Sequence, residues 1–242
     1  MQKQEKIVQM FDNIAPTYDI TNRVLSLGID KMWRKHAVDF VLEKYSNKII
    51  NVADIACGTG DMIALWNERA NKVGASIKAI AGIDPSAGML EVAKKKFAKN
   101  PKVRLEHAYA DNTGLEAEWA DIISISYGIR NVSARTAALR EFNRVLKIDG
   151  YLVVLEFTKR SKDGFMAGLR DFYLLKVLPK IGGFISKNKD AYQYLPQSIE
   201  SFLDKDEFKA ELKDAGFQVE ITNGFSFDIS TMFVARKVKE LD

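Results

Sequence analysis

The sequence predicts an α/β protein whose sheet is open, mostly parallel and covered by helices on both faces. Five short apolar segments alternate with stretches of helical length between residues 49 and 157. A glycine-containing loop follows the first of these segments, at the place where such sheets bind nucleotide-type ligands. Two more strand-like segments adjoin each other near the end of the chain. We therefore expect a seven-stranded sheet that ends in an antiparallel hairpin.

Residues 1–46 are expected to form an N-terminal helical extension. Apolar residues recur there at helical spacing, first at Ile7, Phe11 and Ile14 and later between residues 33 and 45. Pro16 is expected to separate two helical stretches, because a proline disfavours helical backbone in the residue before it.

The alternating strands are expected at residues 49–55, 77–83, 103–109, 120–127 and 150–157. Segments 61–74 and 86–98, which lie between some of them, have the length of helices. Strands that are connected through helices run parallel to one another, and the helices then cover both faces of the sheet.

The alternation stops after residue 157, and residues 158–200 are predicted to form an inserted cap near the substrate, largely helical up to Pro179. Asp204 and Glu207 have the spacing of a capping box, and Gly216 suits the end of the helix that they begin. Two strands follow, and a tight turn is expected near Asn223-Gly224. Residues 1–242 are thus predicted to form a single domain.

Composition narrows the function classes. The chain has 242 residues, of which 47% are hydrophobic and 28% charged, as in an ordinary globular protein. Cys57 is the only cysteine, so no intramolecular disulfide can form and a reducing, cytoplasmic location is expected. A net charge of +4 is too weak to indicate a nucleic-acid partner, and no stretch is apolar enough to span a bilayer.

The loop after the first strand carries the strongest chemical signal. Gly58 and Gly60 let the backbone pass close to a ligand, and Asp54 and Asp61 flank them. A dinucleotide-binding loop would need a third glycine where Ile63 stands, and the two acids would repel a pyrophosphate. Carboxylates suit a ligand with an ammonium and a sulfonium group, which favours S-adenosylmethionine over NAD.

Acidic and amide side chains also follow the next two strands. Asp84, followed by Pro85 as a first helical residue, is placed to accept hydrogen bonds from both ribose hydroxyls, although a helix N-cap is an equally good interpretation of Asp84 alone. Asp111 and Asn112 follow the third strand, where they can reach an adenine amino group. Taken singly, the segment that contains them is usually only a turn.

Five segments together carry a resemblance to a known family. They are residues 11–34 (FDNIAPTYDITNRVLSLGIDKMWR), 54–61 (DIACGTGD), 126–132 (SYGIRNV), 144–157 (RVLKIDGYLVVLEF) and 192–202 (YQYLPQSIESF). The chain resembles the demethylmenaquinone methyltransferase and ubiquinone-biosynthesis C-methyltransferase family over nearly its whole length. This resemblance implies a Rossmann-like class I methyltransferase fold and S-adenosyl-L-methionine as cofactor, with S-adenosyl-L-homocysteine as product.

The resemblance also implies roles for individual residues. It implies cofactor contacts from Thr59, Asp84, Asp111, Asn112 and Ser126, which join those expected from Asp54, Gly58 and Gly60 of the loop. Departures from the family pattern lie elsewhere: Asp30 and Lys31 replace His-Arg, Ala134 replaces Asp, Ile148-Asp149 replaces Pro-Gly and Leu203 replaces Pro. They concern the substrate end more than the reaction type.

The expected reaction is methylation of an electron-rich ring carbon of a prenylated quinol, for which positioning supplies most of the catalysis. Arg130 is the candidate cation beside the quinol hydroxyl, with Asn131 orienting that hydroxyl or a bridging water. A surface salt bridge is the competing interpretation of Arg130. Tyr18 is expected to help bind or deprotonate the quinol, or only to pack. The substrate pocket is further assigned to Asp19, Tyr127, Tyr192 and Tyr194.

No metal is expected, because two separated histidines and one cysteine give no ligand set for a transition metal. Both histidines are more often packed or surface residues than catalytic bases.

The prenyl tail of such a substrate stays in the bilayer, so the enzyme is expected to meet the inner face of the cytoplasmic membrane peripherally and transiently. The insertion offers apolar and basic side chains for this contact: Phe165, Leu169, Phe172, Tyr173, Lys176, Lys180, Lys187 and Lys189. A cap helix packed on the domain is an equal alternative.

The expected substrate is demethylmenaquinol. A benzoquinol of ubiquinone biosynthesis, or another phenol or lipid, is the alternative within the methyltransferases. Ile63 and the closing pair of strands disfavour an NAD-dependent oxidoreductase, and the intact glycine loop disfavours a binding module with a decayed cofactor site. Whether the chain forms a homodimer is left open.

Overall fold

The computed structural model describes residues 2–159, 168, 172–177 and 189–240. Its sheet has seven strands in the order β3-β2-β1-β4-β5-β7-β6. The strands are β1 (Ile49–Ile55), β2 (Ser76–Asp84), β3 (Val103–His107), β4 (Ala120–Ser126), β5 (Leu146–Glu156), β6 (Phe217–Phe225) and β7 (Ser230–Lys237). β1 to β5 pair in parallel, and β7 pairs antiparallel with both β5 and β6. The predicted sheet and its closing hairpin are confirmed.

Helices cover both faces of the sheet because successive strand residues point to opposite sides. In β4, Ile122 packs with Trp66 of α4 (Asp61–Ala70), whereas Ile123 packs with Phe142 of α6 (Arg135–Val145). The remaining helices around the sheet are α3 (Ile29–Leu42), α5 (Ala87–Phe97) and α10 (Lys205–Asp214). Short helical turns are η1 (Ala15–Thr17), η2 (Glu43–Tyr45), η3 (Asn71–Val73), η4 (Ile129–Asn131) and the π-helical η5 (Tyr173–Val177).

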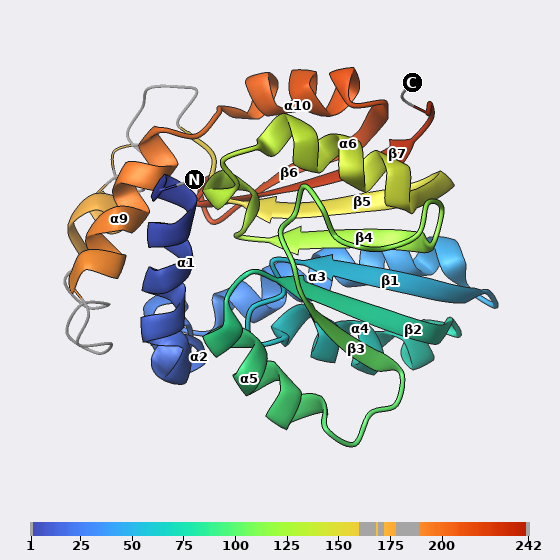
Figure 1. Ribbon diagram of the computed structural model, residues 1–242. Coiled ribbons are helices and arrows are strands. Elements are labelled where there is room, and N and C mark those ends of the chain that lie inside the picture. The colour runs from blue at the N-terminus through green and yellow to red at the C-terminus, as the bar shows by residue number, and fades with distance from the viewer. Residues whose placement is uncertain (1, 160–167, 169–171, 178–188, 241–242) are drawn as a thin grey trace.

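The helices that do not cover the sheet faces lie together at the end of the sheet toward which β4 and β5 point (Figure 1). They are α1 (Gln2–Ile14), α2 (Tyr18–Ser26) and α9 (Lys189–Glu200). β1 lies between β2 and β4, so the direction in which successive strands are added reverses beside it. Ligands of open α/β sheets bind outside the carboxyl ends of the strands at such a point, and the N-terminal helices stand over it.

The N-terminal extension breaks at Pro16, as predicted, since α1 ends at Ile14 and α2 begins at Tyr18. Pro16 lies in η1, which leads directly into α2. The larger break comes at Leu27 and Gly28, which both adopt left-handed backbone conformations between α2 and α3. Gly28 supplies the conformation at no steric cost, and the sequence analysis did not identify this turn.

The turn of the last hairpin was predicted in the wrong place. Asn223 and Gly224 lie inside β6, where they pair with Met232 and Thr231. The chain reverses after Phe225, through three consecutive non-glycine residues with positive φ, Ser226, Phe227 and Asp228. The capping box of Asp204 and Glu207 at the start of α10 is confirmed.

Of the predicted cap, residues 160–167, 169–171 and 178–188 lie outside the described residues. The expectation of a helix up to Pro179 is therefore not tested, nor are the roles given to Phe165, Leu169, Lys180 and Lys187. No helix in the described part of the chain is long and apolar enough to cross a bilayer.

Candidate active site

The loop from β1 to α4 forms the floor of the site. Ala56, Gly58 and Gly60 all have positive φ, so the chain turns sharply away from the sheet before α4 begins. A Cβ on Gly60 would collide with the ring of Phe97, whereas a Cβ on Gly58 would meet no atom within 4 Å. Gly58 therefore faces open space, as a loop that lies against a ligand requires.

Asp54 is a buried carboxylate that is only partly satisfied by the protein. The hydroxyl of Ser124 on β4 donates to its Oδ1 at 2.7 Å, but its Oδ2 has no hydrogen-bond partner among the described residues. Burial raises the pKa of Asp54 to about 7, against the opposing effect of the Ser124 hydrogen bond. A buried carboxylate oxygen without a partner fits a ligand that brings a positive charge or a donor.

Asp84 ends β2 and is tied to the glycine loop. Its two oxygens accept 2.8 Å hydrogen bonds from the backbone N–H groups of Gly58 and Ser86. Burial raises its pKa to about 6, although these two hydrogen bonds oppose the shift. The N-cap of α5 is Ser86, whose side chain accepts from the N–H of Met89, so Pro85 precedes the cap and is not the first helical residue.

A cavity of about 600 Å³ lies over this loop. Five of the predicted cofactor residues line it: Gly58, Asp84, Asp111, Asn112 and Ser126. Gln4, Glu5, Ile7, Val8 and Phe11 of α1 close its other side, which the sequence analysis did not foresee. The open Gly58 and the cavity, together with the unpartnered Asp54 oxygen beneath the loop, fit a cationic nucleoside cofactor.

Thr59, Gly60 and Asp54 do not line this cavity. The Thr59 hydroxyl instead donates to the carboxylate of Asp19 on α2 at 2.5 Å. Asp61, which was expected to repel anions beside the loop, accepts hydrogen bonds from Arg23 and Lys96. Burial opposes ionisation of Asp61, but Lys96 and then Arg23 lower its pKa overall.

A second, smaller cavity of about 110 Å³ lies beside the first and is mainly apolar and aromatic. Its walls include four predicted substrate residues, Tyr18, Tyr127, Arg130 and Tyr194. Phe11, Tyr18 and Tyr127 line both cavities. The two cavities therefore meet at these rings, as methyl transfer between two bound molecules requires.

Tyr127 is held in a strained backbone conformation, with a φ of 59°. Its ring stacks on Phe157 at a centroid distance of 4.7 Å, and its hydroxyl lies 2.9 Å from that of Ser230. Burial raises the pKa values of both Tyr127 and Tyr18, so both phenols stay protonated at neutral pH. Tyr127 and Tyr18 thus form fixed, neutral walls where the cavities join.

Arg130 lines the aromatic cavity, but its guanidinium is already engaged. Nη1 donates to Glu156 and to the backbone oxygen of Tyr127, each at 2.7 Å, and Nε donates to Ser198. Glu156 is completely buried, so this ion pair also holds the end of β5 to η4.

Asn131 lines the cofactor cavity, and its Oδ1 accepts a 3.0 Å hydrogen bond from Tyr194. The side chain of Tyr192 lies outside what the structure describes.

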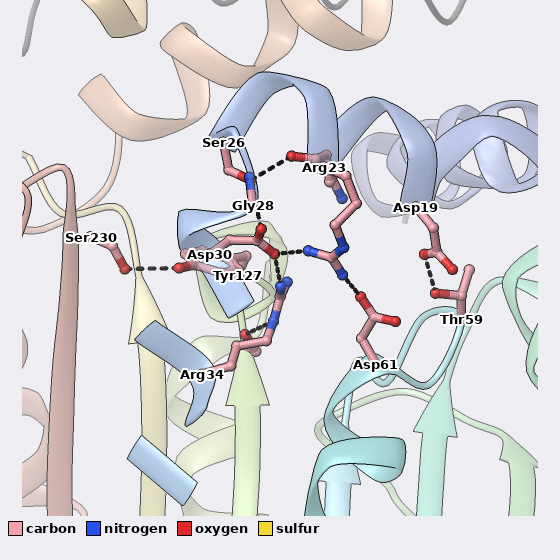
Figure 2. A network of polar contacts seen from close by, with 12 residues as sticks. Asp19, Arg23, Ser26, Gly28, Asp30, Arg34, Thr59, Asp61, Tyr127 and Ser230 are labelled. Carbon is pink, nitrogen blue, oxygen red and sulfur yellow. Dashed lines mark hydrogen bonds and ion pairs between the residues drawn. The ribbon is translucent and has the colours of Figure 1, made fainter. Parts of the chain in front are cut away.

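A polar network that the sequence analysis missed joins the N-terminal helices to the glycine loop (Figure 2). Arg23 bridges two carboxylates, Asp30 of α3 and Asp61 of α4. Asp30 also pairs with Arg34 one turn further along α3. Because burial opposes the charge on Asp30, it is the hydrogen bond from Arg23 and the charge of Arg34 that lower its pKa overall. The sequence offered one signal, since residues 30 and 31 depart from the family pattern.

No cluster of three His, Cys, Asp or Glu side chains that could hold a metal ion occurs in the parts of the chain that are described.

Comparisons with known proteins agree with this geometry. Residues 1–237 match the model of the ubiE/COQ5 methyltransferase family. The ubiquinone/menaquinone biosynthesis C-methyltransferase UbiE of Campylobacter jejuni is 59% identical over 238 residues, which cover 98% of this chain and 100% of that protein. The protein of the same name from Geotalea uraniireducens is 41% identical, with 98% of each chain covered.

Among solved structures, a SAM-dependent methyltransferase from Aquifex aeolicus is similar in fold, with a TM-score of 0.59 at 18% identity, over 83% of this chain and 89% of that one. This likeness confirms the predicted Rossmann-like methyltransferase fold. The chain belongs to the ubiE/COQ5 methyltransferase family, and S-adenosylmethionine is its cofactor.

Proposed function

We propose that this protein methylates a ring carbon of demethylmenaquinol, giving menaquinol. The observation that carries the proposal is the meeting of a polar, carboxylate-bearing cavity and an aromatic cavity at Tyr18 and Tyr127. The names of the relatives cover both the menaquinone and the ubiquinone routes. Tyr18, Tyr127 and Phe157 give the cavity aromatic walls that suit a fused two-ring quinol, and we therefore prefer the naphthoquinol as substrate.

The residues of the site bring the reactants together and shape their charge. Bound S-adenosylmethionine supplies a methyl group on a positively charged sulfur. Asp54 and Asp84 favour that positive ligand once they are ionised, while the cavity lining holds it beside Tyr18 and Tyr127. Closely held reactants with a fixed direction of attack account for most of the rate enhancement in such reactions.

Roles for Arg130, Asn131 and Tyr18 belong to the same proposal. Arg130, anchored by Glu156, places its charge at the wall of the aromatic cavity. The Tyr194–Asn131 hydrogen bond joins α9 to η4 where the two cavities adjoin. Asp19 holds Thr59 and so keeps α2 against the glycine loop.

We further propose that the enzyme reaches its prenylated substrate at the cytoplasmic face of an anionic membrane. Ile20, Val24 and Leu27 form an exposed apolar stripe along α2, and Leu27 is 85% exposed. Lys31 and Lys35, both exposed on the adjoining α3, would meet anionic headgroups. Phe172 of the insertion is also exposed.

Methyl transfer from radiolabelled S-adenosylmethionine to reduced demethylmenaquinone, compared with the matching benzoquinol, tests the function. Preferential labelling of the naphthoquinol supports the proposal. Preferential labelling of the benzoquinol would move the protein to the ubiquinone route, and labelling of neither would leave only a different phenol or lipid as substrate.

A further inference from the structure

Two arginines line the aromatic cavity, and they differ in how fully the protein neutralises them. Arg130 has Glu156 to itself, and a backbone carbonyl and a hydroxyl take further N–H groups of its guanidinium. Arg34 shares its one carboxylate, Asp30, with Arg23. A carboxylate that serves two guanidinium groups compensates each less completely than one that serves a single group.

Nη2 of Arg34 has no hydrogen-bond partner among the described residues, and the same holds for Nη2 of Arg130. Nε of Arg34 donates to Ser126 at 3.3 Å and its Nη1 donates to Asp30. The guanidinium of Arg34 lies over the ring of Tyr127, 5.2 Å from its centroid. Arg34 is therefore fixed between a cofactor-cavity residue and the shared wall of the two cavities.

Arg34 keeps its charge in spite of burial. Its side chain is only 9% exposed, and burial favours the neutral form, yet Tyr127 and Asp30 raise its pKa above the ordinary value. The other titratable groups that line the cavity are Asp30, Tyr18, Tyr127, Arg130, Tyr173 and Tyr194. Within that set, Asp30 is the only carboxylate, and Figure 2 shows it beside the guanidinium of Arg34.

We propose that Arg34 is a catalytic residue that binds the quinol hydroxyl and stabilises the negative charge which that oxygen develops during methyl transfer. This assignment rests on the proposed function, since it names the group that recognises the quinol oxygen. A preorganised cation in a water-poor site stabilises a developing oxyanion more strongly than solvent does.

Besides the quinol and the methyl donor, this step needs only water. The hydroxyl proton passes to water, and the electron pair that this frees pushes into the ring. The ring carbon forms a bond to the methyl carbon as the carbon–sulfur bond breaks, and its electron pair stays on sulfur. The ring carbon then gives its hydrogen to water as a proton and the oxygen takes one back, so that one proton is released overall.

Arg34→Gln tests the proposal, because Asp30 keeps Arg23 as a partner and the fold does not have to bury an unpaired carboxylate. Arg34→Lys retains a charge without the fork of donors. Lys72→Gln is the matched control, since it removes a cation that lines neither cavity, whose ammonium pairs with Glu68 and is 53% exposed. Cofactor binding, followed by thermal shift with S-adenosylhomocysteine, shows that each variant is folded.

Two measurements test the role of Arg34 and the proposed function separately. The first is methyl transfer to reduced demethylmenaquinone, which should fall roughly 100-fold in Arg34→Gln, less in Arg34→Lys and not at all in Lys72→Gln. The second is the absorbance titration of bound 1-naphthol, whose hydroxyl pKa should be lowered by about one unit in the wild-type protein and not in Arg34→Gln.

Equal naphthol titrations in wild-type and Arg34→Gln protein would overturn the assignment, whatever the methylation assay shows. A wild-type protein that methylates no quinol would remove the proposed function. In that case the naphthol titration would still decide whether Arg34 binds an aromatic oxyanion.

Discussion

Replacing Asp54 by asparagine should stabilise the cofactor-free protein and weaken cofactor binding at the same time. Asp54 is 1% exposed, and one of its oxygens lacks a partner among the described residues. Its pKa rises from 3.8 to about 7 on folding. The folded state therefore holds a proton that the unfolded chain has lost, so the contribution of Asp54 to the free energy of unfolding is highest below pH 4 and falls as the pH rises through 7.

The size of the effect follows from this shift. Three pKa units correspond to about 4 kcal/mol of destabilisation at pH 8, at roughly 1.4 kcal/mol per unit. The asparagine keeps an oxygen for Ser124 but places an amide N–H where the free carboxylate oxygen was, which costs about 1–3 kcal/mol. The net gain is about 2 kcal/mol, or roughly 4–8 °C in melting temperature for a chain of this size.

The assay is thermal and urea unfolding of wild-type and Asp54→Asn protein at pH 4 and pH 8, with and without S-adenosylmethionine. The gain should appear at pH 8, shrink toward pH 4, and be accompanied by a roughly 10- to 100-fold loss of cofactor affinity, because the negative charge beneath the glycine loop is removed. Asp61→Asn is the control of opposite sign, since Lys96 and Arg23 lower the pKa of Asp61 and its stabilisation is present at pH 8 and lost in acid. A cofactor-free Asp54→Asn protein that melts below the wild type at pH 8 would refute the reasoning.

Three further outcomes are expected. Gly60→Ala should destabilise the fold by more than about 1–3 kcal/mol in a urea melt, because it combines left-handed strain with a steric collision. Gly58→Ala should leave stability closer to the wild type and mainly weaken cofactor binding, which calorimetric titration would show. Arg130→Gln should cost about 3–5 kcal/mol in the urea melt by leaving Glu156 buried and unpaired, and adding Glu156→Gln should restore much of it; no recovery would mean that the pair does not stabilise the fold as a unit. Leu27→Asp should reduce sedimentation with anionic vesicles without changing cofactor affinity, and unchanged sedimentation would remove the α2 stripe from the proposed membrane contact.

The strands were the most predictable part of the fold. A strand buried on both sides is marked by its own run of apolar residues, so β1, β2 and β4 were expected within a residue of their observed bounds. Turns were less predictable, because their position depends on how far a partner strand continues to pair. Asn223 and Gly224 have turn chemistry, but pairing with Met232 and Thr231 keeps them in β6.

The candidate site likewise has residues that the sequence predicted and residues that it did not. Gly58, Asp84, Asp111, Asn112 and Ser126 follow strands whose carboxyl ends meet at one edge of the sheet, so their gathering around one cavity followed from the strand pattern. The contribution of α1 to the cofactor cavity had no such local signal, because the packing of that helix depends on distant elements such as α5.

By itself, the sequence determined the sheet, its order of alternation, the glycine loop at the tip of β1 and the resemblance that led to the family, because each is a pattern within a short stretch of chain. Only the tertiary structure decided which charges meet. Arg23 reaches Asp61 across 38 residues, and Arg34 reaches Ser126 across 92. How far the charge of an arginine is compensated depends on the carboxylates that folding brings beside it. Arg34 shares its carboxylate with Arg23, whereas Arg130 does not share Glu156.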